Sequence, residues 1–256
     1  MSETELKFPL KSGRIIIERG TKNTTMQKEN LRLGETIEPL GKNQLKIIQD
    51  KNNYRFSLDS MLLAQFVNLK NKEKIIDLGT GCGIIPLLIY DSAKNHTIYA
   101  VEIQDKLADI AERNVILNHL ENKIHILHDD MRNLKDQFRG ESFDVVTANP
   151  PYIPAGKGKL SATDEQMLAR HEINITLDNM ILISSHLLKK RGRIYLIHRA
   201  DILIPVIMTL KKYQLEPKVL QFVYTIRNHH ARRFLIEARK GGGTELKIMT
   251  PLFLND

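Results

Sequence analysis

The chain has 256 residues, of which 42% are hydrophobic and 27% charged, a size and composition typical of one large globular domain or a domain with a small appendage. No stretch approaches the roughly 18 consecutive apolar residues of a membrane span, and the first 30 residues lack the pattern of a secretory signal. The single cysteine, Cys82, excludes an internal disulfide framework and a multi-cysteine zinc site. We therefore expect a cytoplasmic protein that uses neither a membrane nor a metal.

The formal net charge of +8 is unevenly distributed along the chain. Residues 74–148 have a net charge of −4, whereas residues 189–240 hold thirteen basic and three acidic side chains, a net charge of +10. A basic flank beside an acidic centre predicts a polyanionic partner that approaches from one side. A lysine-rich proteome would produce the same total, so charge alone leaves that alternative open.

The N-terminal part of the chain divides into two segments ahead of a regular pattern. Residues 1–25 are polar and without periodicity, and we expect them to be a disordered or non-native extension. Residues 26–72 are expected to form an N-terminal cap segment on a main domain that spans residues 73–256. Apolar side chains at helical spacing follow Ser57 and Asp59, and each of these two residues is a suitable N-cap.

From residue 74 onward, short apolar runs alternate with helical patterns. This alternation predicts an α/β fold with a mostly parallel seven-stranded sheet and helices on both faces. The last two runs have no helix between them, so one closing strand is expected to be antiparallel. The expected strands are residues 74–78, 97–102, 123–128, 143–148, 193–198, 218–225 and 232–239. The expected helices are residues 84–90, 105–120, 177–190 and 201–213.

A glycine-rich loop joins the first expected strand to the first expected helix. Residues 77–83, Asp-Leu-Gly-Thr-Gly-Cys-Gly, differ in spacing from the Gly-x-Gly-x-x-Gly dinucleotide fingerprint. Asp77 at the strand end repels a pyrophosphate but pairs with an ammonium group, and Glu102 at the end of the next strand is placed to accept from ribose hydroxyls. A ligand that has both a cationic amino-acid tail and a ribose is S-adenosylmethionine, which fits this pair of carboxylates better than NAD does. The candidate cofactor-binding residues here are Asp77, Gly79, Thr80, Gly81, Gly83 and Glu102.

Asp129, Asp130 and Met131 follow the third expected strand. One of the two carboxylates would accept a hydrogen bond from the adenine amine of the cofactor, and Met131 would cover the adenine ring. The sequence leaves open which aspartate does so. A solvated strand end or a helix N-cap is the alternative for each of them.

The fourth expected strand ends at Asn149-Pro150-Pro151-Tyr152, where two prolines hold a rigid, extended turn. A planar amine is a poor nucleophile because its lone pair is delocalised. The side-chain oxygen of Asn149 and the carbonyl of Pro150 would each accept one amine hydrogen and polarise the nitrogen toward the methyl sulfonium of the cofactor. Tyr152 would stack on the planar acceptor. We therefore predict that this tetrad is catalytic, and we also expect Asn149 to contact the cofactor.

With these motifs the chain resembles the class I methyltransferases of the Asn-Pro-Pro-Tyr type, and among them the bacterial valine-tRNA adenine N6-methyltransferase family. The resemblance implies a Rossmann-like fold, S-adenosylmethionine as the donor, and N6-methylation of the adenosine at position 37, next to the anticodon, in the anticodon stem-loop of tRNA. It adds Phe56, Ser57 and Ile103 to the expected cofactor contacts, with packing and helix capping as the alternative for Phe56 and Ser57. The stretches that carry the resemblance are residues 54–60, 77–83, 101–104, 149–152, 169–172, 195, 197–199 and 240–242.

Eight further side chains are candidate RNA contacts. The loop after the tetrad has two lysines next to the expected acceptor site, and the +10 segment has arginines near strand ends, where they suit phosphate forks and base stacking. For each residue alone, a solvated face, an ion pair or a cap is the alternative. The candidates are Lys157, Lys159, Arg170, His171, His198, Arg199, Arg232 and Arg233.

Two other functions share parts of this pattern. Glutamine N5-methylation of a protein release factor uses the same planar-amide chemistry, but residues 26–72 are too few for the helical substrate domain of such enzymes. A non-catalytic RNA-binding module of the same fold is the second alternative, and the intact acid–glycine loop and tetrad argue against it. We expect the protein to act as a monomer.

Overall fold

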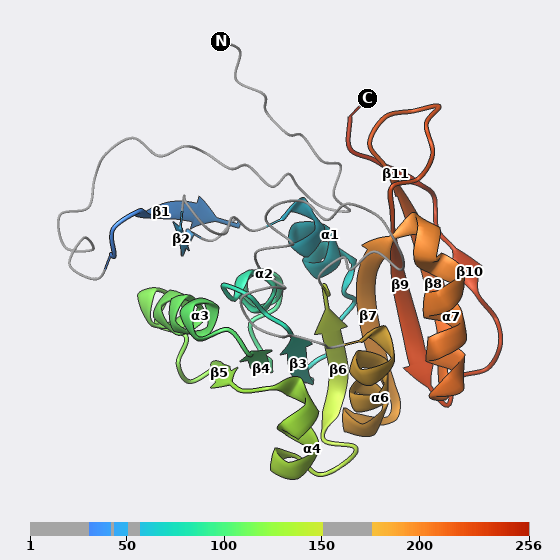
Figure 1. Ribbon diagram of the computed structural model, residues 1–256, viewed down its shortest axis with the longest axis horizontal. Helices are drawn as coiled ribbons and strands as arrows, with labels where there is room; N and C mark the ends of the chain where they lie inside the picture. Colours follow the sequence, from blue (N-terminus) through green and yellow to red (C-terminus); the bar gives the residue numbers. More distant parts are fainter. Residues whose placement is uncertain (1–30, 42–43, 51–56, 151–175, 256) are drawn as a thin grey trace.

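The computed structural model describes residues 31–41, 44–50, 57–150 and 176–255, which form an α/β structure around one large sheet (Figure 1). The long strands of this sheet are β3 (Lys74–Leu78), β4 (Thr97–Glu102), β5 (Ile124–His128), β6 (Phe143–Ala148), β7 (Leu188–Arg199), β8 (Leu215–Tyr224) and β9 (Arg233–Lys240). Two short strands, β10 (Lys247–Ile248) and β11 (Leu252–Phe253), pair with β8. The long strands lie in the order β8-β9-β7-β6-β3-β4-β5.

The sheet is parallel from β5 to β7, and β9 is its antiparallel strand. β9 pairs in the antiparallel direction with both β7 and β8, so the last long strand inserts between two strands that precede it in the chain. The prediction of seven mostly parallel strands with an antiparallel closing strand is therefore confirmed. One consequence is that the C-terminal end of β7 and the N-terminal end of β9 lie together, with Arg199 opposite Arg233.

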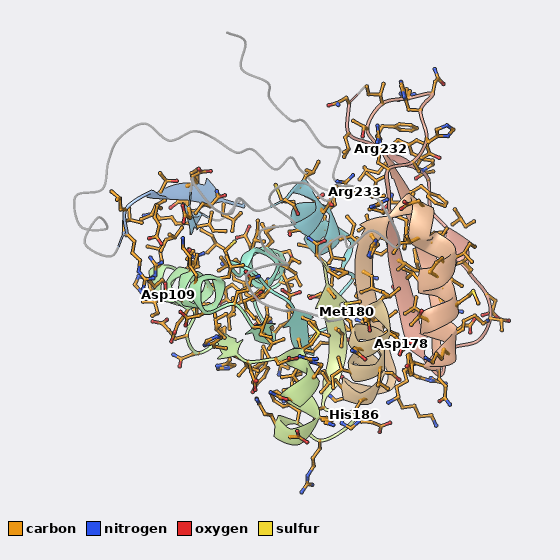
Figure 2. All side chains as sticks on the ribbon, in the orientation of Figure 1. Asp109, Asp178, Met180, His186, Arg232 and Arg233 are labelled. Atoms are coloured by element: carbon orange, nitrogen blue, oxygen red, sulfur yellow. The ribbon has the colours of Figure 1, made fainter. Side chains whose placement is uncertain are left out.

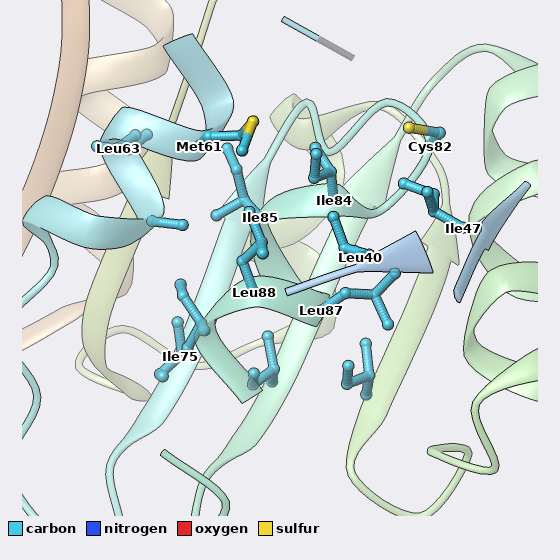
Figure 3. Close-up of a cluster of buried hydrophobic side chains, with 14 of the residues drawn as sticks. Leu40, Ile47, Met61, Leu63, Ile75, Cys82, Ile84, Ile85, Leu87 and Leu88 are labelled. Carbon is cyan, nitrogen blue, oxygen red and sulfur yellow. The ribbon is translucent and has the colours of Figure 1, made fainter. Parts of the chain in front are cut away.

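Successive residues of the strands point into two separate cores, as shown by Ile75 and Ile76 on β3. The first core lies under α1 (Leu58–Phe66), α2 (Ile84–Ser92) and α3 (Asp105–Leu117), and Figure 3 shows its side chains. The second lies under the 3-10 turn η1 (Met131–Asn133), α4 (Leu134–Gln137), α6 (Leu177–Leu187), the 3-10 turn η2 (Ala200–Ile202) and α7 (Leu203–Lys212). Helices cover both faces, as expected.

A β-hairpin that the sequence did not predict precedes α1. Its strands are β1 (Glu35–Leu40) and β2 (Leu45–Asp50), and it docks on α3 through polar contacts. Arg113 pairs with Glu35 at 2.6 Å, and Asn114 Oδ1 accepts the Ile48 N–H at 2.6 Å. Neither strand alternates apolar and polar residues, which is why the pattern was missed. The division into a cap segment and a main domain stays a prediction.

The predicted helix over residues 177–190 was wrong at its C-terminal end. The helix ends at Leu187, and Leu188 begins β7 by pairing with Phe143 at the start of β6. Only glycine fits at position 192, because the chain turns tightly here and a Cβ would lie 2.8 Å from the Lys189 carbonyl oxygen. Tertiary pairing of a buried leucine therefore overrides the local helical pattern.

Across these four ranges, none of the helices is both long and apolar enough to cross a membrane.

Candidate active site

The carboxyl ends of β3, β4, β5 and β6 meet at one edge of the sheet, where open α/β sheets bind their ligands. The loop after β3 leads directly into α2, whose N-cap is Gly83 in the left-handed conformation with φ +82°. A Cβ at Gly83 would lie 3.3 Å from the Cβ of Ala111 on α3. Glycine is therefore needed here both for the backbone conformation and for the close approach of the loop to α3.

Asp77 on β3 is a buried carboxylate with one unmatched oxygen. The residue is 1% exposed, and its Oδ1 accepts a hydrogen bond from Thr147 Oγ1 at 2.6 Å. Its Oδ2 and the Thr80 hydroxyl oxygen find no hydrogen-bond partner among the described residues. Burial raises the pKa of Asp77 to about 6, although the Thr147 hydrogen bond and the nearby Thr80 hydroxyl, which is too poorly placed for a full hydrogen bond, act to lower it. Such a half-satisfied carboxylate fits a ligand with a cationic donor such as an ammonium group.

Glu102 ends β4 and ties the glycine loop to the start of α3. Its Oε2 accepts the Gly81 N–H at 2.8 Å, and its Oε1 accepts the Gln104 N–H at 2.9 Å. Burial raises the pKa of Glu102, and these backbone N–H groups act in the opposite direction. A carboxylate has about four acceptor sites, so Glu102 can hold the loop and still accept from two hydroxyls. Ile103, the next residue, is half-buried at the same edge.

Asp129 and Asp130 both bond to the segment that follows β5. Asp130 Oδ1 caps η1 by accepting the Arg132 N–H at 2.8 Å. Partial burial acts to raise the pKa of Asp130, but its bonds to Arg132 outweigh burial and lower the pKa. Asp129 accepts from Asn133 Nδ2 at 2.8 Å and from Gln137 Nε2. The capping alternative thus holds for Asp130, and a contact of either carboxylate with an adenine stays a prediction.

Met131 is placed beside the glycine loop. The residue is buried in the second core, and its Cε lies 3.9 Å from the position that a Cβ on Gly79 would occupy. The flexible thioether therefore borders the same edge as Asp77 and Glu102, as a ring-covering role requires.

Asn149 follows β6 directly, and its amide is held by the N-terminal turn of α1. Asn149 Nδ2 donates to Ser60 Oγ at 3.0 Å and to Ser57 Oγ at 3.3 Å. Ser57 is the N-cap of α1, which confirms one of the two N-cap candidates, Ser57 and Asp59. Sequence reasoning missed Ser60, and the two serines three residues apart at a helix start are the signal that would have identified it.

The basic segment 189–240 is divided between the two ends of the sheet. Four of its thirteen cations lie at the carboxyl ends of the parallel strands, and the rest lie toward the opposite end. Figure 2 shows Arg232 and Arg233 at the first end and His186 at the other. The expectation of a single basic side therefore needs correction, because a run of charge along the chain is not a surface patch. The four cations at the carboxyl ends are Arg199, Arg227, Arg232 and Arg233.

Three of the predicted RNA contacts at this end already have protein partners. Arg233 pairs with Asp59 of α1 at 2.5 Å, and Arg199 pairs with Asp201. His198 is 7% exposed and accepts the Arg199 N–H at 2.8 Å. Burial lowers the pKa of His198 to about 4, and the positive charge of Arg199 adds to this effect. His198 is therefore neutral at physiological pH, and its expected role as part of a cationic tract is corrected. Arg232 is exposed.

Seven predicted site residues lie outside the described residues: Phe56, Pro151, Tyr152, Lys157, Lys159, Arg170 and His171. In the part of the chain that the structure does describe, no group of three or more His, Cys, Asp or Glu residues is arranged to hold a metal ion.

Comparison with known proteins supplies the family. A family model described as the methyltransferase small domain matches residues 54–219, which include the glycine loop and the Asn149 tetrad. The chain belongs to the methyltransferase small domain family.

Curated relatives carry a more specific name. The protein named tRNA1(Val) (adenine(37)-N6)-methyltransferase of Aliivibrio salmonicida is 26% identical over 187 residues, 71% of this chain and 75% of the relative. The protein of the same name in Bacteroides thetaiotaomicron is 26% identical over 215 residues, 83% of this chain and 82% of the relative.

Solved structures of other proteins share the fold. A predicted O-methyltransferase of Agrobacterium tumefaciens has a TM-score of 0.61 and 22% identity, over 77% of this chain and 87% of that one. The TYW2 protein of M. jannaschii, solved in complex with AdoMet, has a TM-score of 0.54 and 16% identity, over 80% of this chain and 85% of that one. At these identities the likeness concerns the fold, and it confirms the predicted class I methyltransferase fold.

Proposed function

We propose that this methyltransferase transfers a methyl group from S-adenosylmethionine to N6 of the adenosine next to the anticodon in tRNA, at position 37 of valine tRNA. The observation that carries the proposal is Asn149 at the end of β6, held by its amide nitrogen at the same sheet edge as Asp77. The names of the curated relatives support the same substrate.

The residues that would hold the donor fit its chemistry. Asp77, with its unmatched Oδ2, would pair with the ammonium group of the methionine end, and Glu102 would accept from the ribose hydroxyls. Met131 would cover the adenine, with Asp129 or Asp130 at its amine. When bound, S-adenosylmethionine supplies an electrophilic methyl group on a sulfonium.

The residues of this chain would act on the acceptor by positioning. Asn149 Oδ1 and the Pro150 carbonyl would accept the two hydrogens of the adenine amine, and this would bring the nitrogen lone pair out of conjugation with the ring. Tyr152 would stack on the base once it is turned out of its stack. The role needs no strong base near the amine, which agrees with the absence of one from the predicted tetrad.

Cations at the carboxyl ends of the strands would meet the RNA backbone. Arg232 and Arg199 are the described candidates, and Lys157, Lys159, Arg170 and His171 complete the proposed RNA contacts. A tRNA substrate implies work in the cytoplasm, where tRNA is modified.

The test is methylation of a defined acceptor. The purified protein is incubated with S-adenosylmethionine and an unmodified transcript of valine tRNA, and the nucleosides are analysed by mass spectrometry. We expect one N6-methyladenosine per tRNA, lost when adenosine 37 of the transcript is replaced by guanosine. Methylation of a release-factor glutamine in its place would reverse the assignment. Binding of tRNA without methylation of either acceptor would favour the non-catalytic module.

A further inference from the structure

The N-terminal turn of α1 contacts the side-chain amide of Asn149, although the two are far apart along the chain. Ser60 lies 89 positions from Asn149 in the chain, and its hydroxyl oxygen is 3.0 Å from Asn149 Nδ2. The Ser57 hydroxyl oxygen is 3.3 Å from the same nitrogen and 3.4 Å from the Ser60 hydroxyl. Ser57 also accepts the Ser60 N–H at 3.4 Å as the helix cap. The two hydroxyls thus form a pair of acceptors for one amide nitrogen.

The orientation of this amide decides whether the site can accept an amine. The terminal torsion of an asparagine side chain is broad and roughly two-fold, so the oxygen and nitrogen exchange places readily unless a partner fixes them. If the nitrogen faced the acceptor, one hydrogen-bond donor would oppose another. An amide whose nitrogen is held by two serine hydroxyls presents its oxygen on the opposite side of the planar group.

The turn that carries these serines is itself anchored. Asp59, between Ser57 and Ser60, is buried and pairs with Arg233 at the start of β9 at 2.5 Å. The following residues of α1 are buried against α2 and the sheet. The serine pair is therefore fixed to the same sheet that carries Asn149 on β6.

We propose that Ser60, assisted by Ser57, is the positioning residue that orients the Asn149 amide, with its oxygen directed to the acceptor amine. Arg233 acts through Asp59 to hold this turn, in place of the RNA contact that the sequence suggested. The inference rests on the proposed function, because orientation of the oxygen matters only for an acceptor that donates hydrogens.

The test compares serine variants in the full-length protein with S-adenosylmethionine and the valine tRNA transcript. Ser60→Ala removes the nearer acceptor, and we expect kcat to fall about 10-fold, as for loss of one hydrogen bond to a reacting group. The dissociation constant of S-adenosylmethionine should stay within about 2-fold, because the hydrogen bonds of the Ser60 side chain go to Ser57 and Asn149. Ser57→Gly keeps the helix start but removes the hydroxyl, so kcat should fall about 3-fold, whereas Ser57→Thr should keep the activity.

A matched control is Ser184→Ala on α6. Ser184 is also a buried helical serine, and its hydroxyl donates to the Met180 carbonyl at 2.7 Å, on the other face of the sheet. This variant should leave kcat unchanged. If Ser184→Ala lowers kcat as much as Ser60→Ala does, the effect is a general cost of removing a serine and the inference fails.

A second measurement reads the contact itself. In protein labelled with 15N-asparagine, the side-chain signal of Asn149 is assigned by its loss in Asn149→Ala. Ser60→Ala should shift this signal and speed exchange of its protons, while Ser184→Ala should not. An unshifted signal together with a wild-type kcat in Ser60→Ala would overturn the inference. Failure of the wild-type protein to methylate tRNA would instead overturn the proposed function, and the signal would still report the contact. If Ser60→Ala does not fold, the Ser57→Gly and Ser57→Thr pair decides.

Discussion

Glu73 and Asp77 are two buried carboxylates at opposite ends of β3, and their surroundings differ. Glu73 is matched on both oxygens: the Arg193 guanidinium donates to Oε1 at 3.0 Å and to Oε2 at 2.8 Å, and the Lys70 N–H donates at 2.7 Å. Asp77 has one oxygen bonded to Thr147, and its other oxygen has no partner in the described ranges. A buried polar group without a partner costs stability. The unpaired oxygen of Asp77 therefore indicates a ligand site, whereas the fully bonded Glu73 indicates a structural ion pair.

Each end of the sheet carries both paired cations and an exposed arginine. At the N-terminal end of β7, Lys189 pairs with Asp144 at 2.9 Å, and Lys240 donates to the Ser185 and Leu188 carbonyls at 2.8 and 2.9 Å. At the other end, Arg232 extends from the start of β9 into solvent. Arg191 near the N-terminal end of β7 is exposed as well, so the two ends differ in the ligand site and not in the presence of an exposed arginine.

The largest expected effect comes from breaking the ion pair between Glu73 and Arg193. Arg193→Met leaves Glu73 buried and unpaired, so the free energy of unfolding should fall by about 3–5 kcal/mol, measured by urea denaturation. The double variant Arg193→Met/Glu73→Gln should recover part of this loss, because no unpaired charge remains. A loss below about 1 kcal/mol in the single variant would mean that water reaches the Glu73–Arg193 ion pair and that this pair does not stabilise the fold.

The next effect is catalytic. Asn149→Ala removes one acceptor for the adenine amine, and kcat should fall about 10²–10³-fold, measured by single-turnover methylation of the valine tRNA transcript. The dissociation constant of S-adenosylmethionine should change less than about 2-fold, because most of the proposed donor contacts are in the glycine loop and at Glu102. Loss of donor affinity instead would place Asn149 in the cofactor site and outside the acceptor site.

The sequence predicted those parts of the site that depend on neighbours along the chain. Asp77 and Glu102 lie at strand ends and Gly83 starts the helix after the first of these strands. The strands were evident from apolar runs, so the meeting of these residues at one edge followed from parallel topology. The contact of Ser60 with Asn149 joins residues 89 positions apart. It depends on where α1 packs, which no local pattern specifies.

The basic segment was the least predictable part. His198 lies on β7 in the run of net charge +10, yet it is buried, because β7 is a central strand and both of its faces are covered. Arg233 lies in the same run and pairs with Asp59, 174 positions earlier. Charge counted along a sequence does not include the acidic partners that folding brings from elsewhere.

A moderate effect of pH should sharpen the contrast between the two carboxylates. Because burial raises the pKa of Asp77 from 3.8 to about 6, the folded protein loses stability as pH rises from about 4 to 6, where the unfolded chain has already ionised. Donor binding has the opposite dependence, since the ammonium group needs the ionised carboxylate. The dissociation constant of S-adenosylmethionine, measured by calorimetry, should rise about 5-fold from pH 6 to pH 5, as the ionised fraction of Asp77 falls.

Asp77→Asn separates this effect from that of Glu102, whose pKa is also raised at the same edge. The variant should bind the donor weakly at pH 7.5, and its affinity should vary less between pH 6 and pH 5. If the variant keeps the wild-type pH profile, Glu102 or the donor itself is the titrating group, and the open oxygen of Asp77 is not the ammonium site.

The smallest expected effect tests which end of the sheet binds tRNA. Arg232→Gln should reduce the slope of log affinity for tRNA against log salt concentration by about 0.7–0.9, the value for one phosphate contact. The slope is measured by filter binding between 50 and 200 mM KCl, roughly the range over which such contacts are resolved. Arg191→Gln is the matched control, because Arg191 is also an exposed arginine but follows Leu188 at the opposite end of the sheet. Equal changes in both slopes would show that tRNA reaches both ends, so the RNA surface would extend well beyond the edge that holds Asn149. A change confined to Arg191 would place the RNA on the opposite end of the sheet and would separate RNA binding from the catalytic edge.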